Sequence, residues 1–366
     1  MPSIVSVSTF NPPHSLKQEV AMEFARELFS ESYQDIERLL TVFSNGQIVE
    51  RQFGVPLEWF KTEHTFQERN DLYIDLATQF GAEVIKLCLE NPTFLKEEVD
   101  VSDIDAIIFV SSSGVATPSL DARIMNKLPF SKHTNRIPLW GLGCAGGAAG
   151  ISRGFEYCKA YPKANVLVVC VELCSLTFQR NDRSKSNLIG TSLFADGVAC
   201  ALLVGDESSL NHVAKQVVKP MIIATQSTLM PHSEDVMGWE LKDSGLHVVF
   251  SRDIPNIIKN WLRPNVEGFL KSQNIPFSEL TEFVAHPGGK KVLESYVAAL
   301  GIDPKMIIES QRILNQHGNM SSPTVLYVLE EIMRKEHAHG DFGLMAALGP
   351  GFSSELLLLQ WNEVYQ

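Results

Sequence analysis

The sequence lacks the charge balance of a nucleic-acid-binding protein. Its 366 residues carry 31 Lys and Arg against 43 Asp and Glu, which gives a formal net charge of −12. Binding to a phosphate backbone needs a basic surface that displaces counterions. We therefore exclude nucleic acid as a partner, whereas a small anionic substrate is compatible because a few local cations suffice for it.

Long apolar runs and paired cysteines are also missing. The N-terminal segment MPSIVSVSTFNPPHSLKQEV has no basic start followed by an apolar stretch, which disfavours a secretory signal. The most apolar stretches, such as 165–171, have the length of a strand and are too short to span a membrane. None of the six cysteines forms a CxxC pair, which disfavours zinc and a disulfide framework. We expect a cytosolic protein without a metal or a membrane span, and with most cysteines reduced and buried.

The segments that are present alternate between strands and helices. Residues 4–9 read as a strand, and Ser15 with Gln18 forms a capping box for a helix through about residue 29. Apolar residues at helical spacing predict a second helix over 72–89. This alternation indicates an α/β fold.

The chain also repeats itself loosely. Three segments of the first half have the same form, in the same order, as three segments of the second half: 103–113 and 279–289, 137–157 and 313–329, 196–205 and 343–360. We infer two fused copies of one α/β unit, an N-terminal half over 1–210 and a C-terminal half over 211–366. The polar segment 206–216 links the two halves.

Cys144 stands inside the glycine-rich segment 141–150. A predicted strand (137–140) leads into this turn and a predicted helix (145–158) leads out of it. A thiol at a helix N-terminus lies near the positive end of the helix dipole, which lowers its pKa and favours the reactive thiolate. The alternative is a tight turn with an inert buried cysteine; the density of glycines, which allow close approach of a ligand, favours a nucleophile.

His286 and Asn319 are the candidate partners of this nucleophile, and both belong to the second half. His286 follows a buried strand and precedes a predicted helix (290–300), a place suited to proton transfer. Asn319 lies where the second copy's helix begins, as Cys144 does in the first copy, and its amide can donate to an oxyanion. The alternatives are a surface histidine and a plain helix N-cap. The duplication favours function, because it brings all three residues together around a pseudo-twofold axis.

Five motifs carry a resemblance to a known family. They are GCAGG around Cys144, LFADG around Phe194, AHPGG around His286, GNMSS around Asn319 and LGPGFSSE around Gly349. In order and spacing the chain resembles the type III polyketide synthases, the chalcone and stilbene synthase family, over nearly its whole length. The resemblance implies a thiolase-like fold, a duplicated five-layer α-β-α-β-α architecture, and a homodimer.

The resemblance also implies the chemistry. Cys144, as a thiolate paired with His286, accepts the acyl group of an acyl-CoA starter. His286 and Asn319 bind the thioester carbonyl of malonyl-CoA and stabilise the enolate that forms when CO2 leaves. That carbanion attacks the acyl-Cys144 thioester and extends the chain by two carbons, repeatedly, without a metal or redox cofactor.

Several further residues match positions around the family's cavity. Phe194 and Val248 match two gatekeeper phenylalanines between the CoA tunnel and the cavity, and the smaller valine predicts a wider passage. Thr117 stands where plant enzymes place a Met that crosses the dimer interface, and Cys174 replaces a Thr, as in pyrone-forming relatives. The remaining cavity-shaping positions are Ser112, Thr177, Ser321 and the cyclisation loop Gly349, Pro350 and Gly351.

Two departures from the plant pattern concern the substrates. The helical stretch that supplies basic residues for the CoA phosphates has none here (42–46), which leaves Arg38 and Arg51 as nearby substitutes. Val248 and Cys174 predict a long aliphatic starter, as in bacterial members that make alkylpyrones from fatty acyl-CoA and malonyl-CoA.

Other readings of the same residues make different predictions. A β-ketoacyl synthase of the fatty-acid initiation type and a hydroxymethylglutaryl-CoA synthase share the fold and the cysteine, but GNMSS and the GPG loop favour a polyketide synthase. A Cys-His-Asn hydrolase lacks the duplication, and its CGSCW-type signature is missing. An inactive acyl-binding homologue predicts a disrupted triad, whereas all three residues are present.

Overall fold

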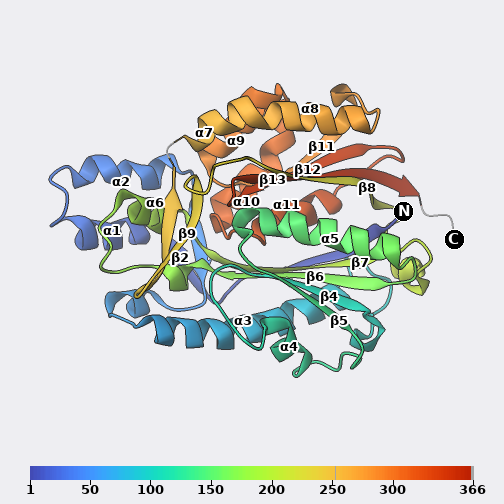
Figure 1. Ribbon diagram of the computed structural model, residues 1–366, viewed down its shortest axis with the longest axis horizontal. Helices are drawn as coiled ribbons and strands as arrows, with labels where there is room; N and C mark the ends of the chain where they lie inside the picture. The colour runs from blue at the N-terminus through green and yellow to red at the C-terminus, as the bar shows by residue number, and fades with distance from the viewer. Residues whose placement is uncertain (252, 364–366) are drawn as a thin grey trace.

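The computed structural model describes residues 1–251 and 253–363, and its elements form five layers (Figure 1). A nine-stranded sheet has the order β11-β12-β13-β8-β1-β7-β6-β4-β5. Its strands are β1 (Ser3–Phe10), β4 (Ala106–Val110), β5 (Asn135–Leu139), β6 (Asn165–Leu173), β7 (Asp196–Val204), β8 (Val218–Leu229), β11 (Leu280–Ala285), β12 (Phe342–Gly349) and β13 (Ser353–Glu363). Two small sheets pair β2 (His14–Lys17) with β3 (Glu50–Phe53) and β9 (Met237–Lys242) with β10 (Gly245–Phe250).

The helices cover and separate the two parts of the large sheet. They are α1 (Gln18–Phe29), α2 (Ile36–Asn45), α3 (Phe66–Leu89), α4 (Leu120–Met125), α5 (Gly146–Ala160), α6 (Lys185–Leu193), α7 (Ile254–Ile257), α8 (Arg263–Ser272), α9 (Lys290–Leu300), α10 (Ile308–His317) and α11 (Thr324–Met333). In Figure 1, α3 and α4 form one outer layer, α5 and α11 the middle layer, and α8 and α9 the other outer layer. The predicted five-layer architecture is confirmed. None of the helices in the described ranges is long and apolar enough to cross a membrane.

The two parts of the sheet repeat one four-stranded unit. The order β4-β6-β7-β1 matches β11-β12-β13-β8, and in both parts the first pair is parallel and the other two pairs are antiparallel. The parts join where Ser3 of β1 pairs with Met221 of β8. The duplication inferred from the sequence is therefore present in the fold.

Two details of the predicted repeat were wrong. Segment 313–329 begins in α10 rather than in a strand, so β5 matches no strand of the second unit within the described residues. The counterpart of β7 is β13 alone, because β12 matches β6. The division into halves at residue 210 stays a prediction, and its C-terminal half includes residues 252 and 364–366, which lie outside the described ranges.

The predicted capping box at Ser15 was also wrong. Ser15 belongs to β2, where pairing with β3 keeps the backbone extended up to Lys17, and its hydroxyl donates to Glu50 at 3.0 Å. A capping box occurs instead at the start of α3, between Thr65 and Glu68, so this helix begins before the predicted residue 72. Local signals alone did not decide between strand pairing and a helix cap.

The middle layer explains many of the glycines near Cys144. Helix α5 contacts strands of both sheet parts as well as α11. A Cβ on Gly147 would lie 2.2 Å from the carbonyl oxygen of Ser322, and one on Gly150 would lie 2.7 Å from a Val168 methyl carbon. A glycine inside a helix costs roughly 0.5–1 kcal/mol relative to alanine. In α5, Gly147 and Gly150 permit close packing of the helix against Ser322 and Val168.

Candidate active site

The turn between β5 and α5 presents Cys144 at the centre of the molecule. Gly141 and Gly143 have φ values of 88° and 47°, and a 3₁₀ turn over Gly143–Ala145 leads into α5. A Cβ on Gly143 would lie 2.8 Å from Cδ of Pro350, so both the backbone conformation and the space require glycine. The Ser112 hydroxyl accepts hydrogen bonds from the Gly141 and Gly143 N–H groups, both at 3.2 Å.

Cys144, His286 and Asn319 line one cavity of about 430 Å³. Their exposed fractions are 9%, 2% and 2%, so all three are buried. The Cys144 Sγ lies 3.8 Å from both Oδ1 and Nδ2 of Asn319. Among the described residues, neither ring nitrogen of His286 has a hydrogen-bond partner. The structure thus brings together the three residues that the sequence singled out, and it leaves the imidazole free to bind a ligand.

Asn319 is positioned by the segment around Phe194 rather than by a helix start. Helix α11 begins five residues after Asn319, at Thr324. Asn319 therefore lies in a turn before a helix, as Cys144 does, but it does not lie at the helix start as predicted. The Asn319 N–H donates to the Leu193 carbonyl at 3.0 Å, and its carbonyl accepts from Ala195 N–H at 2.9 Å. Its side-chain Nδ2 donates to the Gly288 carbonyl at 3.2 Å and its Oδ1 accepts from the Ser321 N–H at 2.8 Å. The amide therefore has a fixed orientation, and its Nδ2 also donates to Cys144 Sγ at 3.8 Å.

Burial acts on the protonation of the predicted Cys144–His286 pair, whose ionised form stays a prediction. Burial raises the pKa of the Cys144 thiol to about 11, although hydrogen bonds from Ser321 and Asn319 act in the opposite direction. Burial also lowers the pKa of His286 to about 3. Exclusion of water thus favours the neutral form of both side chains. A thiolate–imidazolium pair requires direct contact between them, because only mutual attraction offsets the loss of solvation.

The sequence prediction missed Glu172, which lies at the junction of the two halves. This buried carboxylate accepts hydrogen bonds from the Ser112 N–H (3.1 and 3.0 Å), the Ser113 hydroxyl (2.7 Å) and the Ser322 hydroxyl (2.9 Å). Burial raises its pKa to about 7 despite these donors. One signal was available in the sequence, because Glu172 is the single charged residue in the otherwise apolar strand β6.

The GPG loop packs on the turn that carries the nucleophile. A Cβ on Gly349 would lie 2.5 Å from the Leu142 carbonyl oxygen, and Pro350 occupies the space beside Gly143. Gly351 has a φ of 132°, another value that favours glycine. The predicted proximity of this loop to Cys144 is present; its role in cyclisation stays a prediction.

A second, apolar cavity of about 60 Å³ lies behind Phe194. Cys174, Thr177, Phe194 and Val248 contribute to its lining. The Phe194 ring lies 5.5 Å from that of Phe250, a residue that lines the Cys144 cavity, so the two cavities are neighbours.

Of the two candidates for binding the CoA phosphates, Arg51 is turned away from solvent, and the role of Arg38 stays a prediction. Arg51 is 2% exposed, and its guanidinium donates to the carbonyls of Thr191 (2.8 Å) and Phe194 (2.6 Å), so it supports a loop rather than faces solvent. Burial lowers its pKa to about 9. Arg38 is exposed, pairs with Asp35 and does not line the Cys144 cavity.

Two further candidates have contacts that do not test their predicted roles. The hydroxyl of Ser112 supports the Cys144 turn, and its part in shaping the cavity stays a prediction. Thr117 is exposed and precedes a cis peptide bond to Pro118. Its predicted place at a dimer interface also stays a prediction.

Comparisons with known proteins agree on one family. The family models for the N-terminal and C-terminal domains of chalcone and stilbene synthases match residues 3–208 and 221–361. A provisionally named chalcone synthase of Bacillus subtilis (strain 168) is 50% identical over 99% of this chain and 100% of its own length. A 1,3,6,8-tetrahydroxynaphthalene synthase of Streptomyces peucetius subsp. caesius is 32% identical over 98% of this chain and 93% of its own length.

The fold agrees with the sequence comparison. The crystal structure of the 1,3,6,8-tetrahydroxynaphthalene synthase of Streptomyces coelicolor A3(2), a bacterial type III polyketide synthase, superposes with a TM-score of 0.91. The two chains are 29% identical, and the match covers 99% of this chain and 100% of the other. Two family models that together cover most of the chain, and relatives of 50% and 32% identity, show that this chain belongs to the chalcone and stilbene synthase family and is a type III polyketide synthase, an acyl-transferring condensing enzyme.

Proposed function

We propose that this enzyme loads a fatty acyl group from acyl-CoA onto Cys144, extends it with malonyl-CoA and releases alkylpyrones. One observation carries the proposal. The thiol of Cys144, the imidazole of His286, which has no hydrogen-bond partner among the described residues, and the oriented amide of Asn319 line the same cavity. This set offers one nucleophile, one base and two hydrogen-bond donors, which the condensation requires.

In the loading step, the Cys144 sulfur attacks the thioester carbonyl of the acyl-CoA. His286 accepts the thiol proton as the C–S bond forms. Burial keeps one ring nitrogen unprotonated but also weakens the base, so the proton is held only while the imidazolium contacts the sulfur and is then passed on. The C–S bond to CoA then breaks, and the CoA thiolate takes that proton. The products are acyl-Cys144 and free CoA.

In the extension step, malonyl-CoA loses CO2 and the electron pair of the broken C–C bond passes into an enolate. One N–H of His286 and the Asn319 N–H that lies near Cys144 donate to the enolate oxygen. The enolate carbon attacks acyl-Cys144, a C–C bond forms, and the C–S bond breaks to return the thiolate. The chain grows by two carbons without an external oxidant or reductant.

An alkyl starter is supported by the second cavity. Apolar side chains dominate its lining, among them Leu16, Phe24, Leu57, Phe60 and Phe178. Each buried methylene group contributes about 0.8 kcal/mol, so this lining favours an alkyl tail over a polar starter. Closure of the extended chain to a pyrone is part of the same proposal.

The proposal is tested by incubation with malonyl-CoA and acyl-CoAs from two to eighteen carbons, with products identified by mass. We expect triketide and tetraketide alkylpyrones that retain the starter chain. Two Streptomyces relatives are named for 1,3,6,8-tetrahydroxynaphthalene. If malonyl-CoA alone gives that compound and alkyl starters are ignored, the starter assignment is wrong; if no acyl-CoA is consumed, the chain is an inactive homologue.

For the CoA phosphates, we propose the lysines at the start of α9. Lys290 and Lys291 line the Cys144 cavity, whereas the facing wall of α2 contributes only uncharged residues, Val42 and Asn45 among them. Because a hydrogen bond to a charged group contributes about 1.5–3 kcal/mol, the double variant Lys290→Ala/Lys291→Ala should raise the KM for malonyl-CoA roughly tenfold at unchanged kcat. Lys271→Ala on α8 serves as the control, and an unchanged KM in the double variant would remove this assignment.

We also propose a homodimer and a cytosolic location. Trp140, which is 58% exposed, directly follows the edge strand β5, and its indole N–H donates to the Gly114 carbonyl at 2.9 Å, next to Val115, which is 41% exposed and lies two residues before Thr117. Exposed apolar groups of this kind are typical of an interface. Light scattering coupled to size-exclusion chromatography measures the mass in solution, and a monomer would contradict the dimer.

A further inference from the structure

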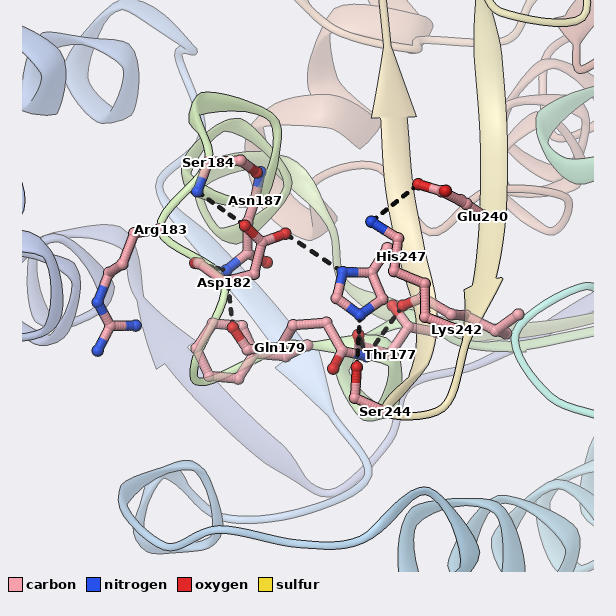
Figure 2. Close-up of polar contacts among 12 residues, drawn as sticks. Thr177, Gln179, Asp182, Arg183, Ser184, Asn187, Glu240, Lys242, Ser244 and His247 are labelled. Atoms are coloured by element: carbon pink, nitrogen blue, oxygen red, sulfur yellow. Dashed lines mark hydrogen bonds and ion pairs between the residues drawn. The ribbon is translucent and has the colours of Figure 1, made fainter.

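A second set of reactive side chains gathers at the β9–β10 hairpin, and none of them lines the Cys144 cavity (Figure 2). The Ser244 hydroxyl lies 2.7 Å from Nε2 of His247, and Nδ1 of the same ring lies 3.4 Å from Oδ2 of Asp182. Figure 2 shows the imidazole between the hydroxyl and the carboxylate. A hydroxyl, an imidazole and a carboxylate in this order form a nucleophile, its base and the group that orients the base.

Contacts between distant segments hold the three groups in place. Oδ1 of Asp182 accepts the backbone N–H two residues further on at 2.8 Å, and Oδ2 is directed at the imidazole. Arg69 donates to the carbonyls of Phe178 (2.6 Å) and Ser244, which ties the turn of the hairpin to the segment before α6. The side chains of His247 and Asp182 are 14% and 20% exposed, whereas Ser244 is exposed. The base is therefore sheltered and the hydroxyl is accessible.

These groups line a cavity of about 960 Å³, which is larger than the one around Cys144. Aromatic side chains contribute apolar surface to it, among them Phe60, Phe66 and Phe178. Its five carboxylates outnumber its three Lys and Arg side chains: Glu63, Glu68, Asp182, Glu240 and Asp243 against Arg69, Arg180 and Lys242. An excess of negative charge repels an anionic substrate. The cavity thus favours a small uncharged molecule with an apolar part over a CoA thioester.

We propose that Ser244, His247 and Asp182 hydrolyse small uncharged carboxylic esters, an activity separate from condensation at Cys144. With its Nδ1 proton donated to Asp182, His247 has a lone pair on Nε2 that takes the Ser244 proton. The Ser244 oxygen bonds to the ester carbonyl carbon, the bond to the alcohol oxygen breaks, and the alcohol leaves with that proton. Water then gives one proton to His247 and its oxygen to the acyl carbon. The bond to Ser244 breaks, the serine recovers the proton, and the carboxylic acid leaves.

Lys242 supplies a positive charge for the oxyanion of this reaction. It shares a face of the hairpin with His247, because Glu240 stands directly opposite His247 and Lys242 lies two residues further along β9. Its Nζ lies 2.9 Å from Glu240 Oε2, and both side chains are exposed. An exposed ion pair contributes little to stability, so the ammonium can turn from the carboxylate to the oxyanion.

The test follows hydrolysis of p-nitrophenyl butyrate, a neutral ester, by the full-length protein and its variants. Each variant is also made in Cys144→Ala, because a reactive thiol attacks activated esters as well. Ser244→Ala and His247→Ala should each lower the rate by about 10²-fold or more, and Asp182→Asn, which keeps the size of the side chain, by about tenfold or more. Cys144→Ala alone should retain the activity. A fluorophosphonate probe, which reacts with activated serines, should label Ser244 in peptide mapping of the wild type.

Ser186→Ala and His64→Ala are the matched controls. Both residues line the same cavity, and the His64 ring stacks on Trp59 at 3.5 Å, so neither loss should change the rate. Melting temperatures and alkylation of Cys144 by iodoacetamide show that the variants are folded. The inference is overturned if folded Ser244→Ala keeps the full rate, if Cys144→Ala abolishes it, or if the wild type neither hydrolyses the ester nor carries the probe on Ser244.

Discussion

The two halves of the molecule place different residues at equivalent points of the same unit. After β4, the first half has Ser111, Ser112 and Ser113; after the matching strand β11, the second half has His286. The serines are satisfied by Glu172, whereas both nitrogens of His286 are unpartnered among the described residues. An unpaired buried polar group costs about 1–3 kcal/mol. The end of β4 therefore serves stability, whereas the end of β11 is left free for a substrate.

The turns before the two middle helices, α5 and α11, also present different side chains. The first half presents the sulfur of Cys144, and the second presents the amide of Asn319, 3.8 Å away. We therefore expect the two halves to contribute different groups. The first half supplies the nucleophile of the covalent intermediate, and the second supplies the base for loading and the donors for release of CO2 from malonyl-CoA.

The largest expected effect comes from removing the nucleophile. Cys144→Ala should lower condensation by about 10³-fold or more, while release of CO2 from malonyl-CoA persists, because His286 and Asn319 are intact. Radiolabelled CO2 and product mass measure the two steps. Cys158→Ala, another buried cysteine, is the control. Loss of both steps in Cys144→Ala would show that the halves do not act separately.

The next effect tests the second half. His286→Ala and Asn319→Ala should each lower CO2 release by about 10²–10³-fold, since each removes one donor to the enolate oxygen. Iodoacetamide should still alkylate Cys144 in Asn319→Ala. His337→Ala, whose ring contacts the Ile332 carbonyl and Trp361, serves as the control. Release of CO2 at the wild-type rate in both variants would contradict the division of labour.

The smallest effect concerns Glu172, which links the halves. Burial raises its folded pKa from 4.5 to about 7, so the folded state binds a proton more tightly than the unfolded state. Binding of this proton contributes up to about 3 kcal/mol to the free energy of unfolding. The contribution is complete below pH 4.5 and is lost as the pH rises to about 7. Glu172→Gln removes this titration.

Urea unfolding at pH 4.5 and 7.5 measures the difference. The wild type should lose more stability between these values than Glu172→Gln. Burial also raises the pKa of Asp196, to about 6. Because Asp196 is present in both proteins, the difference between their pH dependences reports the titration of Glu172. Identical pH dependence in the two proteins would show that Glu172 is ionised throughout and that the hydrogen bonds from the serines outweigh burial.

Local sequence signals predicted the catalytic candidates well and their surroundings poorly. Cys144 and His286 stand in glycine-rich turns at the ends of strands, and such turns are recognisable from neighbouring residues alone. Arg51 resembled a phosphate ligand because it is basic, but it is buried against carbonyl oxygens supplied by residues 191 and 194. Ser15 resembled a helix cap, but pairing with β3 kept it in a strand. In each error, a partner distant in sequence outweighed the local preference.

The sequence by itself determined the family, the duplicated α/β unit and the identity of the three residues around the cavity, because strand–helix periodicity and glycine turns are local properties. Only the tertiary structure decided that the thiol and the imidazole are buried, which favours their neutral forms, since burial depends on all surrounding layers. It also decided that Trp239 of β9 lies directly opposite Val248 of β10, because cross-strand pairing brings together residues nine positions apart in the chain. Charge state and cavity shape are properties of the packed interior, and no single segment of the chain encodes them.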